Sequence, residues 1–127
     1  MILLDTNVLI EILEKRSREG EEMYSSLISS GEAIATTAIN LHELLYGLEK
    51  YAKPLKEILQ LPVIDYTKQD AELSSRIELD MENAGLKTRR MDTMIAAIAI
   101  NHSAKLFTLD KKHFEPISKR TSLQLSL

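Results

Sequence analysis

The hydrophobic and polar positions at the start of the chain predict a short strand followed at once by a helix. Residues 2–4 are apolar without a break, and the run ends at Asp5. Apolar residues then recur at helical spacing, as Val8, Leu9, Ile12 and Leu13. An unbroken apolar strand is typical of a parallel sheet that is covered on both faces. We therefore expect Asp5 at the C-terminal tip of a buried strand.

Short apolar runs and helical stripes alternate along the rest of the chain. Further strands are predicted over residues 33–37, 62–66, 106–108 and 121–127. Helices are predicted over residues 23–28, 40–51, 54–61, 67–84 and 92–100, with a short one after residue 110 and a charged connector over residues 15–22. Such alternation predicts an α/β fold, with a mostly parallel central sheet of about five strands and helices on both faces.

Two glycines receive a specific interpretation. Gly31 follows a helical stripe and suits the left-handed position after a helix. Gly47 lies inside a predicted helix, four residues after Glu43 and on the same face. Because glycine weakens a helix relative to alanine, we expect a close approach by another group at Gly47.

Composition limits the class of protein. The 127 residues fit one domain, residues 1–127, and 44% hydrophobic with 28% charged residues is ordinary for a globular protein. The absence of cysteine excludes disulfides and thiolate metal sites, and fits the cytoplasmic location that we expect. The longest apolar run, residues 94–100, is too short to span a membrane. The net charge of −3 argues against tight non-specific nucleic-acid binding but does not exclude a nuclease.

Four acidic residues share one predicted setting. Asp5 and Asp110 follow short strands, while Glu43 and Asp92 lie near the starts of helices. These places fall on the carboxyl edge of a parallel sheet, where ligands bind. Clustered carboxylates raise one another's pKa, and a divalent cation with oxygen ligands, Mg²⁺ or Mn²⁺, relieves the conflict. Each acid also has a structural alternative, since Asp5 and Asp92 suit helix starts and Glu43 suits a solvated surface.

Four segments carry these acids in an order that resembles a known family. They are LLDTNVLI with Asp5, ELLYG with Glu43, DTMIAAIAI with Asp92 and TLDKKHF with Asp110. Together they resemble the PIN-domain ribonucleases, in particular the VapC toxins of type II toxin–antitoxin pairs. The resemblance covers almost the whole chain.

The resemblance implies metal-dependent hydrolysis of RNA, with the four acids holding Mg²⁺ or Mn²⁺. Thr6, Asn40 and Thr108 are expected to support the acids. The basic residues that flank the acids are candidates to bind RNA phosphates: Arg89, Arg90, Lys111 and Lys112. A small VapB-like antitoxin and a homodimer are the implied protein partners.

Other functions remain open from the sequence. A haloacid-dehalogenase-type phosphatase would need an aspartate at position 7, which is Asn7, and a receiver domain would need an acidic pair and a lysine that we do not find. A PIN-like scaffold that binds RNA or protein without catalysis is the non-enzymatic alternative. No role is expected for the histidines, which are His42, His102 and His113.

Overall fold

A parallel sheet forms the centre of the fold. The computed structural model describes residues 1–51 and 60–126, and in these residues five strands pair in the order β3-β2-β1-β4-β5. They are β1 (Ile2–Leu4), β2 (Ile34–Thr37), β3 (Val63–Ile64), β4 (Lys105–Phe107) and β5 (Gln124–Ser126). All the pairings are parallel, which confirms the predicted sheet.

The central strand β1 owes its place to its unbroken apolar sequence. Leu3 pairs with Ala35 of β2 on one side and with Leu106 of β4 on the other. All three residues are buried. Just beyond the strand, the Asp5 amide donates to the Phe107 carbonyl at 2.9 Å. The carboxyl ends of β1 and β4 therefore lie side by side, with Asp5 between them.

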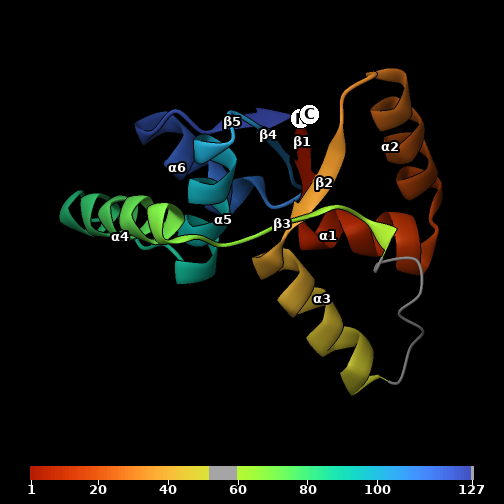
Figure 1. Ribbon diagram of the computed structural model, residues 1–127, viewed down its shortest axis with the longest axis horizontal. Helices are drawn as coiled ribbons and strands as arrows, with labels where there is room; N and C mark the ends of the chain where they lie inside the picture. Colours follow the sequence, from red (N-terminus) through yellow and green to blue (C-terminus); the bar gives the residue numbers. More distant parts are fainter. Residues whose placement is uncertain (52–59, 127) are drawn as a thin grey trace.

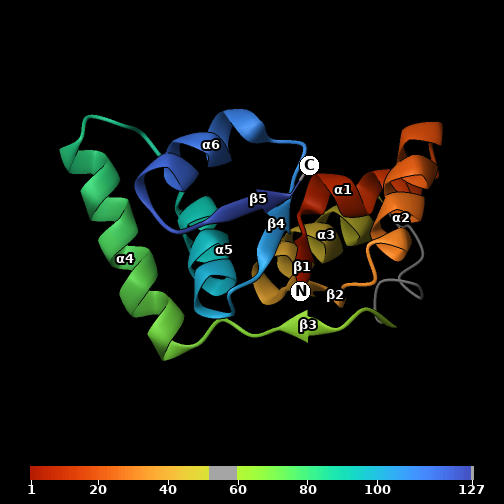
Figure 2. The ribbon, with the colours of Figure 1, turned by 90° about the horizontal axis from the view of Figure 1, so that it is seen from above.

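Helices cover both faces of the sheet (Figures 1 and 2). Their bounds are α1 (Thr6–Leu9), the π-helix η1 (Ile10–Lys15), α2 (Arg18–Ser29), α3 (Ala38–Lys50), α4 (Lys68–Asn83), α5 (Arg90–Asn101) and α6 (Lys111–Arg120). Ile2 and Leu4 pack in one core cluster with residues of α1, α2 and α3. Leu3 points to the opposite face and packs in a second cluster with residues of α4, α5 and α6.

Helix α5 is buried nearly all round, as its sequence predicts. Its apolar residues from Ile95 to Ala99 are at most 1% exposed. The small side chains of Ala96 and Ala99 belong to the cluster that contains Leu3 and Leu106. Asp92 lies in the first turn of this helix and is buried.

The predicted connector over residues 15–22 is wrong. Helix α2 begins at Arg18, and the Ser17 hydroxyl caps it by accepting from the Gly20 amide at 2.9 Å. The charged residues from Arg18 onward form the first turns of the amphipathic helix α2. A run of charged residues in a sequence does not by itself distinguish such a helix from a loop. Gly20 packs directly against η1, since a Cβ atom there would lie 2.2 Å from the Glu11 carbonyl oxygen.

Other local predictions have mixed outcomes. Gly31 has a φ of +69°, as expected. Thr67 and Asp70 form a reciprocal capping box at the start of α4. The expected close approach at Gly47 is wrong, because no described atom lies within 4 Å of a Cβ built there. The predicted helix over residues 54–61 falls largely outside the described residues. In the described ranges, no helix is long and apolar enough to cross a membrane.

Candidate active site

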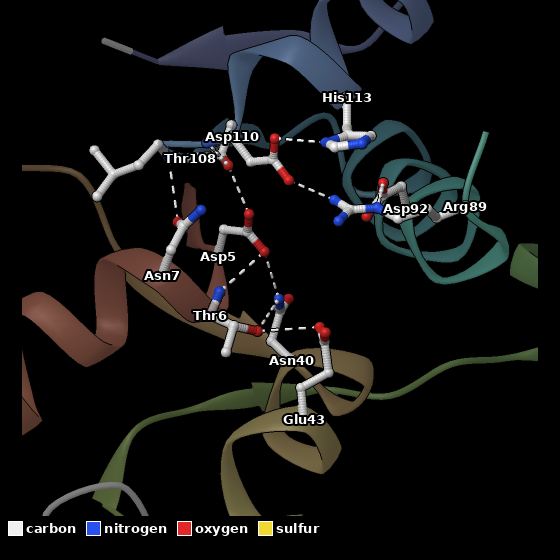
Figure 3. Close-up of polar contacts among 11 residues, drawn as sticks. Asp5, Thr6, Asn7, Asn40, Glu43, Arg89, Asp92, Thr108, Asp110 and His113 are labelled. Carbon is white, nitrogen blue, oxygen red and sulfur yellow. Dashed lines mark hydrogen bonds and ion pairs between the residues drawn. The ribbon is translucent and has the colours of Figure 1, made fainter. Parts of the chain in front are cut away.

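Asp5 lies at the carboxyl end of β1 and accepts hydrogen bonds from three sides (Figure 3). Its Oδ1 accepts from the Thr6 amide at 2.9 Å and from Asn40 Nδ2 at 2.8 Å. Its Oδ2 accepts from the Thr108 hydroxyl at 2.6 Å. Asp5 is only 6% exposed, so these donors fix the direction of its carboxylate. Asp5 is also the N-cap of α1, which is the structural role that the sequence analysis gave as its alternative.

Asn40 connects Asp5 to Glu43. The side chain of Asn40 is fully buried, and its Oδ1 accepts from the Thr37 hydroxyl at 2.7 Å. Its Nδ2 donates to Thr6 Oγ1 at 3.0 Å as well as to Asp5. The Thr6 hydroxyl in turn donates to Glu43 Oε1 at 3.1 Å. Glu43 is half-buried and faces the end of β1, and does not lie on a solvated surface.

Arg89 bridges the other two acids. Its Nε donates to Asp92 Oδ2 at 2.6 Å, and its Nη2 donates to Asp110 Oδ2. Asp110 is further fixed because its amide donates to Thr108 Oγ1 at 2.9 Å. The Thr108 hydroxyl therefore contacts both Asp5 and Asp110. In Figure 3 the four acids surround one space at the carboxyl edge of the sheet.

His113 is a site residue that the sequence analysis missed. Its Nδ1 lies 2.7 Å from Asp110 Oδ1, and Nδ1 must be the donor because an ionised carboxylate only accepts. His113 follows Asp110 by three residues at the start of α6, the spacing that places two side chains on one helix face. That spacing was the available signal.

Burial and mutual repulsion raise the pKa of three acids. Desolvation is the main cause for Asp5, Glu43 and Asp92. Hydrogen bonds oppose the rise in each pKa, and neighbouring carboxylates add to it. The pKa of Asp110 is lowered instead, because the hydrogen bonds from His113 and Arg89 outweigh its desolvation. Protonation of the site is thus set by the same contacts that position it.

Comparison with known proteins places this arrangement in a family. The family model described as "PIN domain" matches residues 2–119. The chain belongs to the PIN-domain family. Ribonuclease VapC2 of Rickettsia felis is 27% identical over 124 residues, which cover 91% of this chain and 90% of that protein. The family resemblance that the four motifs predicted is confirmed.

Solved structures share the fold of this PIN domain along its length. VapBC2 from Rickettsia felis, bound to a DNA fragment from their promoter, has a TM-score of 0.82 at 27% identity. That likeness covers 99% of this chain and 98% of the other. A toxin–antitoxin complex from Klebsiella pneumoniae has a TM-score of 0.73 at 26% identity and covers 90% of both chains.

The donor set of this PIN domain fits a hard divalent cation. All four candidate side chains offer carboxylate oxygen, and three of them are raised in pKa by a setting that disfavours their charge. The arrangement is not a closed metal cage. Among the described residues, no three Asp, Glu, His or Cys side chains lie close enough together to hold an ion. Arg89 instead supplies positive charge to Asp92 and Asp110.

The remaining basic candidates lie in different settings. Arg90 donates from Nε and Nη2 to the two carboxylate oxygens of Glu78, both at 3.0 Å, and so ties α5 to α4. Lys111 and Lys112 are exposed at the start of α6, next to Asp110. Neither lysine forms an ion pair within the part of the chain that the structure describes.

Proposed function

We propose that this PIN domain is an endoribonuclease that hydrolyses RNA phosphodiester bonds with Mg²⁺ or Mn²⁺ and acts as the toxin of a toxin–antitoxin pair. The convergence of the four acids at the carboxyl edge is the observation that carries the proposal. The relative that is named a ribonuclease supports the substrate class. The alternative is a non-catalytic scaffold that binds RNA or protein. Such a scaffold does not explain why four acids lie together although desolvation disfavours the charge of three of them and raises their pKa values.

Asp5, Glu43, Asp92 and Asp110 are the proposed catalytic residues and would hold the divalent ion. When bound, such an ion activates water and stabilises the negative charge that develops at phosphorus. The chain itself orients the acids. Thr108 and Asn40 fix the carboxylate of Asp5. Thr6 directs that of Glu43.

The residues that we propose to bind RNA are basic side chains without an acidic partner in the described part of the chain. Lys111 and Lys112 are exposed beside Asp110, where they can bind phosphates of the RNA backbone. Phosphate contacts of this kind give affinity without sequence selection. Arg90 is less suited to this role because both its donors already bind Glu78. Arg89 is engaged by the acids themselves.

The proposed protein partners are a small VapB-like antitoxin and a second copy of the chain, in the cytoplasm. One similar structure is a toxin–antitoxin complex, and another contains VapBC2. Tyr24, Tyr46 and Tyr51 are 53%, 63% and 67% exposed, and aromatic side chains are enriched in protein interfaces. These tyrosines are the surface features that we assign to either interface.

Cleavage of a 5′-labelled single-stranded RNA by the purified protein tests the proposal. We expect fragments with Mg²⁺ or Mn²⁺, none with excess chelator, and no cleavage of a DNA of the same sequence. A scaffold would retain RNA in a binding assay but leave it intact under every condition. Equal cleavage with metal and with chelator would contradict the metal dependence.

A further inference from the structure

We propose that Arg89 is a displaceable counter-ion of the acidic site, which holds Asp92 and Asp110 in the metal-free protein and must release them before a divalent cation binds. The proposal rests on the metal dependence proposed above and deepens it. It makes Arg89 a residue that sets the affinity of the site for metal.

The geometry shows that Arg89 reaches into the site from solvent. Its side chain is 53% exposed, whereas those of Asp92 and Asp110 are 8% and 22% exposed. Its Nε and Nη2 contact one oxygen of each carboxylate (Figure 3). Asp92 is held by a buried helix and Asp110 by the Thr108 hydroxyl. The long arginine side chain is therefore the part that can move when another cation arrives.

The charges make the two cations competitors. A guanidinium places one positive charge between two carboxylates, and a divalent ion would place two charges on the same oxygens. Both cannot be held there at once, because they repel each other across a short distance in a partly desolvated site. The absence of a ready group of three metal-binding side chains in the described residues agrees with a site that Arg89 now neutralises.

Arg90 provides the contrast that separates this role from an ordinary ion pair. Arg90 is adjacent in sequence and donates to a carboxylate from the same two nitrogen positions. Among the described residues its acidic partner is Glu78, on α4 and outside the acidic site. Arg89 spans two acids from two different elements, α5 and the turn before α6. Removing either arginine changes the net charge equally, but only Arg89 touches the proposed ligands.

Calorimetric titration of Mn²⁺ into the purified wild type, Arg89→Gln and Arg90→Gln tests the proposal without an activity readout. We expect Arg89→Gln to lower the apparent Kd about tenfold, because the ion no longer has to displace a charge-assisted pair. Arg90→Gln should stay within about twofold of wild type, since any long-range charge effect is screened by salt. Arg89→Lys keeps the charge but loses the two-pronged donor, so its affinity should lie between those of Arg89→Gln and wild type.

The outcomes distinguish this inference from the proposed function. Binding of Mn²⁺ to wild type with equal Kd values for the Arg89→Gln and Arg90→Gln variants overturns the counter-ion role alone. No Mn²⁺ binding by any of the proteins overturns the metal dependence and this inference together. If Arg89→Gln does not fold in chelator, Arg89→Lys decides the question, and an affinity equal to wild type or weaker contradicts the proposal.

Discussion

The hydroxyl of Thr108 donates a 2.6 Å hydrogen bond to Asp5 Oδ2 across 103 positions of sequence. The Thr108 hydroxyl oxygen also accepts a hydrogen bond from the Asp110 amide at 2.9 Å. One buried side chain therefore ties the end of β1 to the turn before α6 and sets the relative positions of two proposed catalytic acids.

Replacement of Thr108 by valine should lower the free energy of unfolding by about 1–3 kcal/mol, because it leaves a buried carboxylate oxygen without its donor. The substitution also removes a hydrogen bond that lowers the pKa of Asp5, so that pKa should rise further. Denaturant unfolding at several pH values measures both effects. A raised carboxyl pKa in the folded state means that stability is lost as pH rises from the unfolded pKa through the raised one. The loss should therefore be larger at pH 7 than at pH 4.

Thr36→Val is the matched control for this prediction. Thr36 is also fully buried, and its hydroxyl donates to the Leu4 carbonyl at 2.8 Å, a group that does not titrate. Its cost should be nearly the same at every pH. An equally flat pH dependence for Thr108→Val would show that the Thr108 bond does not control the Asp5 carboxyl.

Asp5→Asn should stabilise the metal-free protein near neutral pH, because it removes a charge that burial and Asp110 disfavour. The wild-type protein should gain more from added Mn²⁺ than the variant, with a gain of roughly 2.7 kcal/mol at a hundredfold excess over Kd. Thermal melts in chelator and in Mn²⁺ measure this. A variant that melts below wild type in chelator would show that Asp5 acts chiefly as the cap of α1.

Two helical glycines should respond to alanine in opposite directions. Gly20→Ala should destabilise the protein by roughly 1–3 kcal/mol, because its new Cβ atom would lie 2.2 Å from the Glu11 carbonyl oxygen. Gly47→Ala should stabilise it by up to about 1 kcal/mol, since alanine favours a helix and no described atom stands near the new methyl group. Urea unfolding of both variants tests the pair. A loss of stability in Gly47→Ala would indicate a close neighbour at that helix after all.

Local patterns in the sequence predicted the parts of the fold that depend on neighbouring residues. The apolar run of β1 ending at Asp5, the helix that begins near Thr67, and the apolar helix after Asp92 all follow from spacing along one segment. The start of α2 did not follow, because its Ser17 cap and the packing of Gly20 on η1 depend on where the preceding helix ends.

The contacts within the site depend on several segments at once, so the sequence did not predict them. Asn40 was expected only as a supporting residue, but it joins Asp5, Thr6 and Thr37 in one buried network. Arg89 was predicted to bind RNA phosphates, which stays a prediction, but its contacts with two acids were not predicted. Such partners are decided by the distance between elements that lie far apart in sequence.

Cleavage of RNA by Asp5→Asn and Asp92→Asn tests the central claim most directly. Each substitution keeps the side-chain shape and removes one carboxylate charge from the proposed site. Asp80→Asn, at an exposed position of α4, makes the same chemical change elsewhere. With Mn²⁺ and folded proteins, the account predicts cleavage by wild type and Asp80→Asn, and a loss of at least about a hundredfold in rate for the two site variants. Cleavage at the wild-type rate by either Asp5→Asn or Asp92→Asn would contradict it.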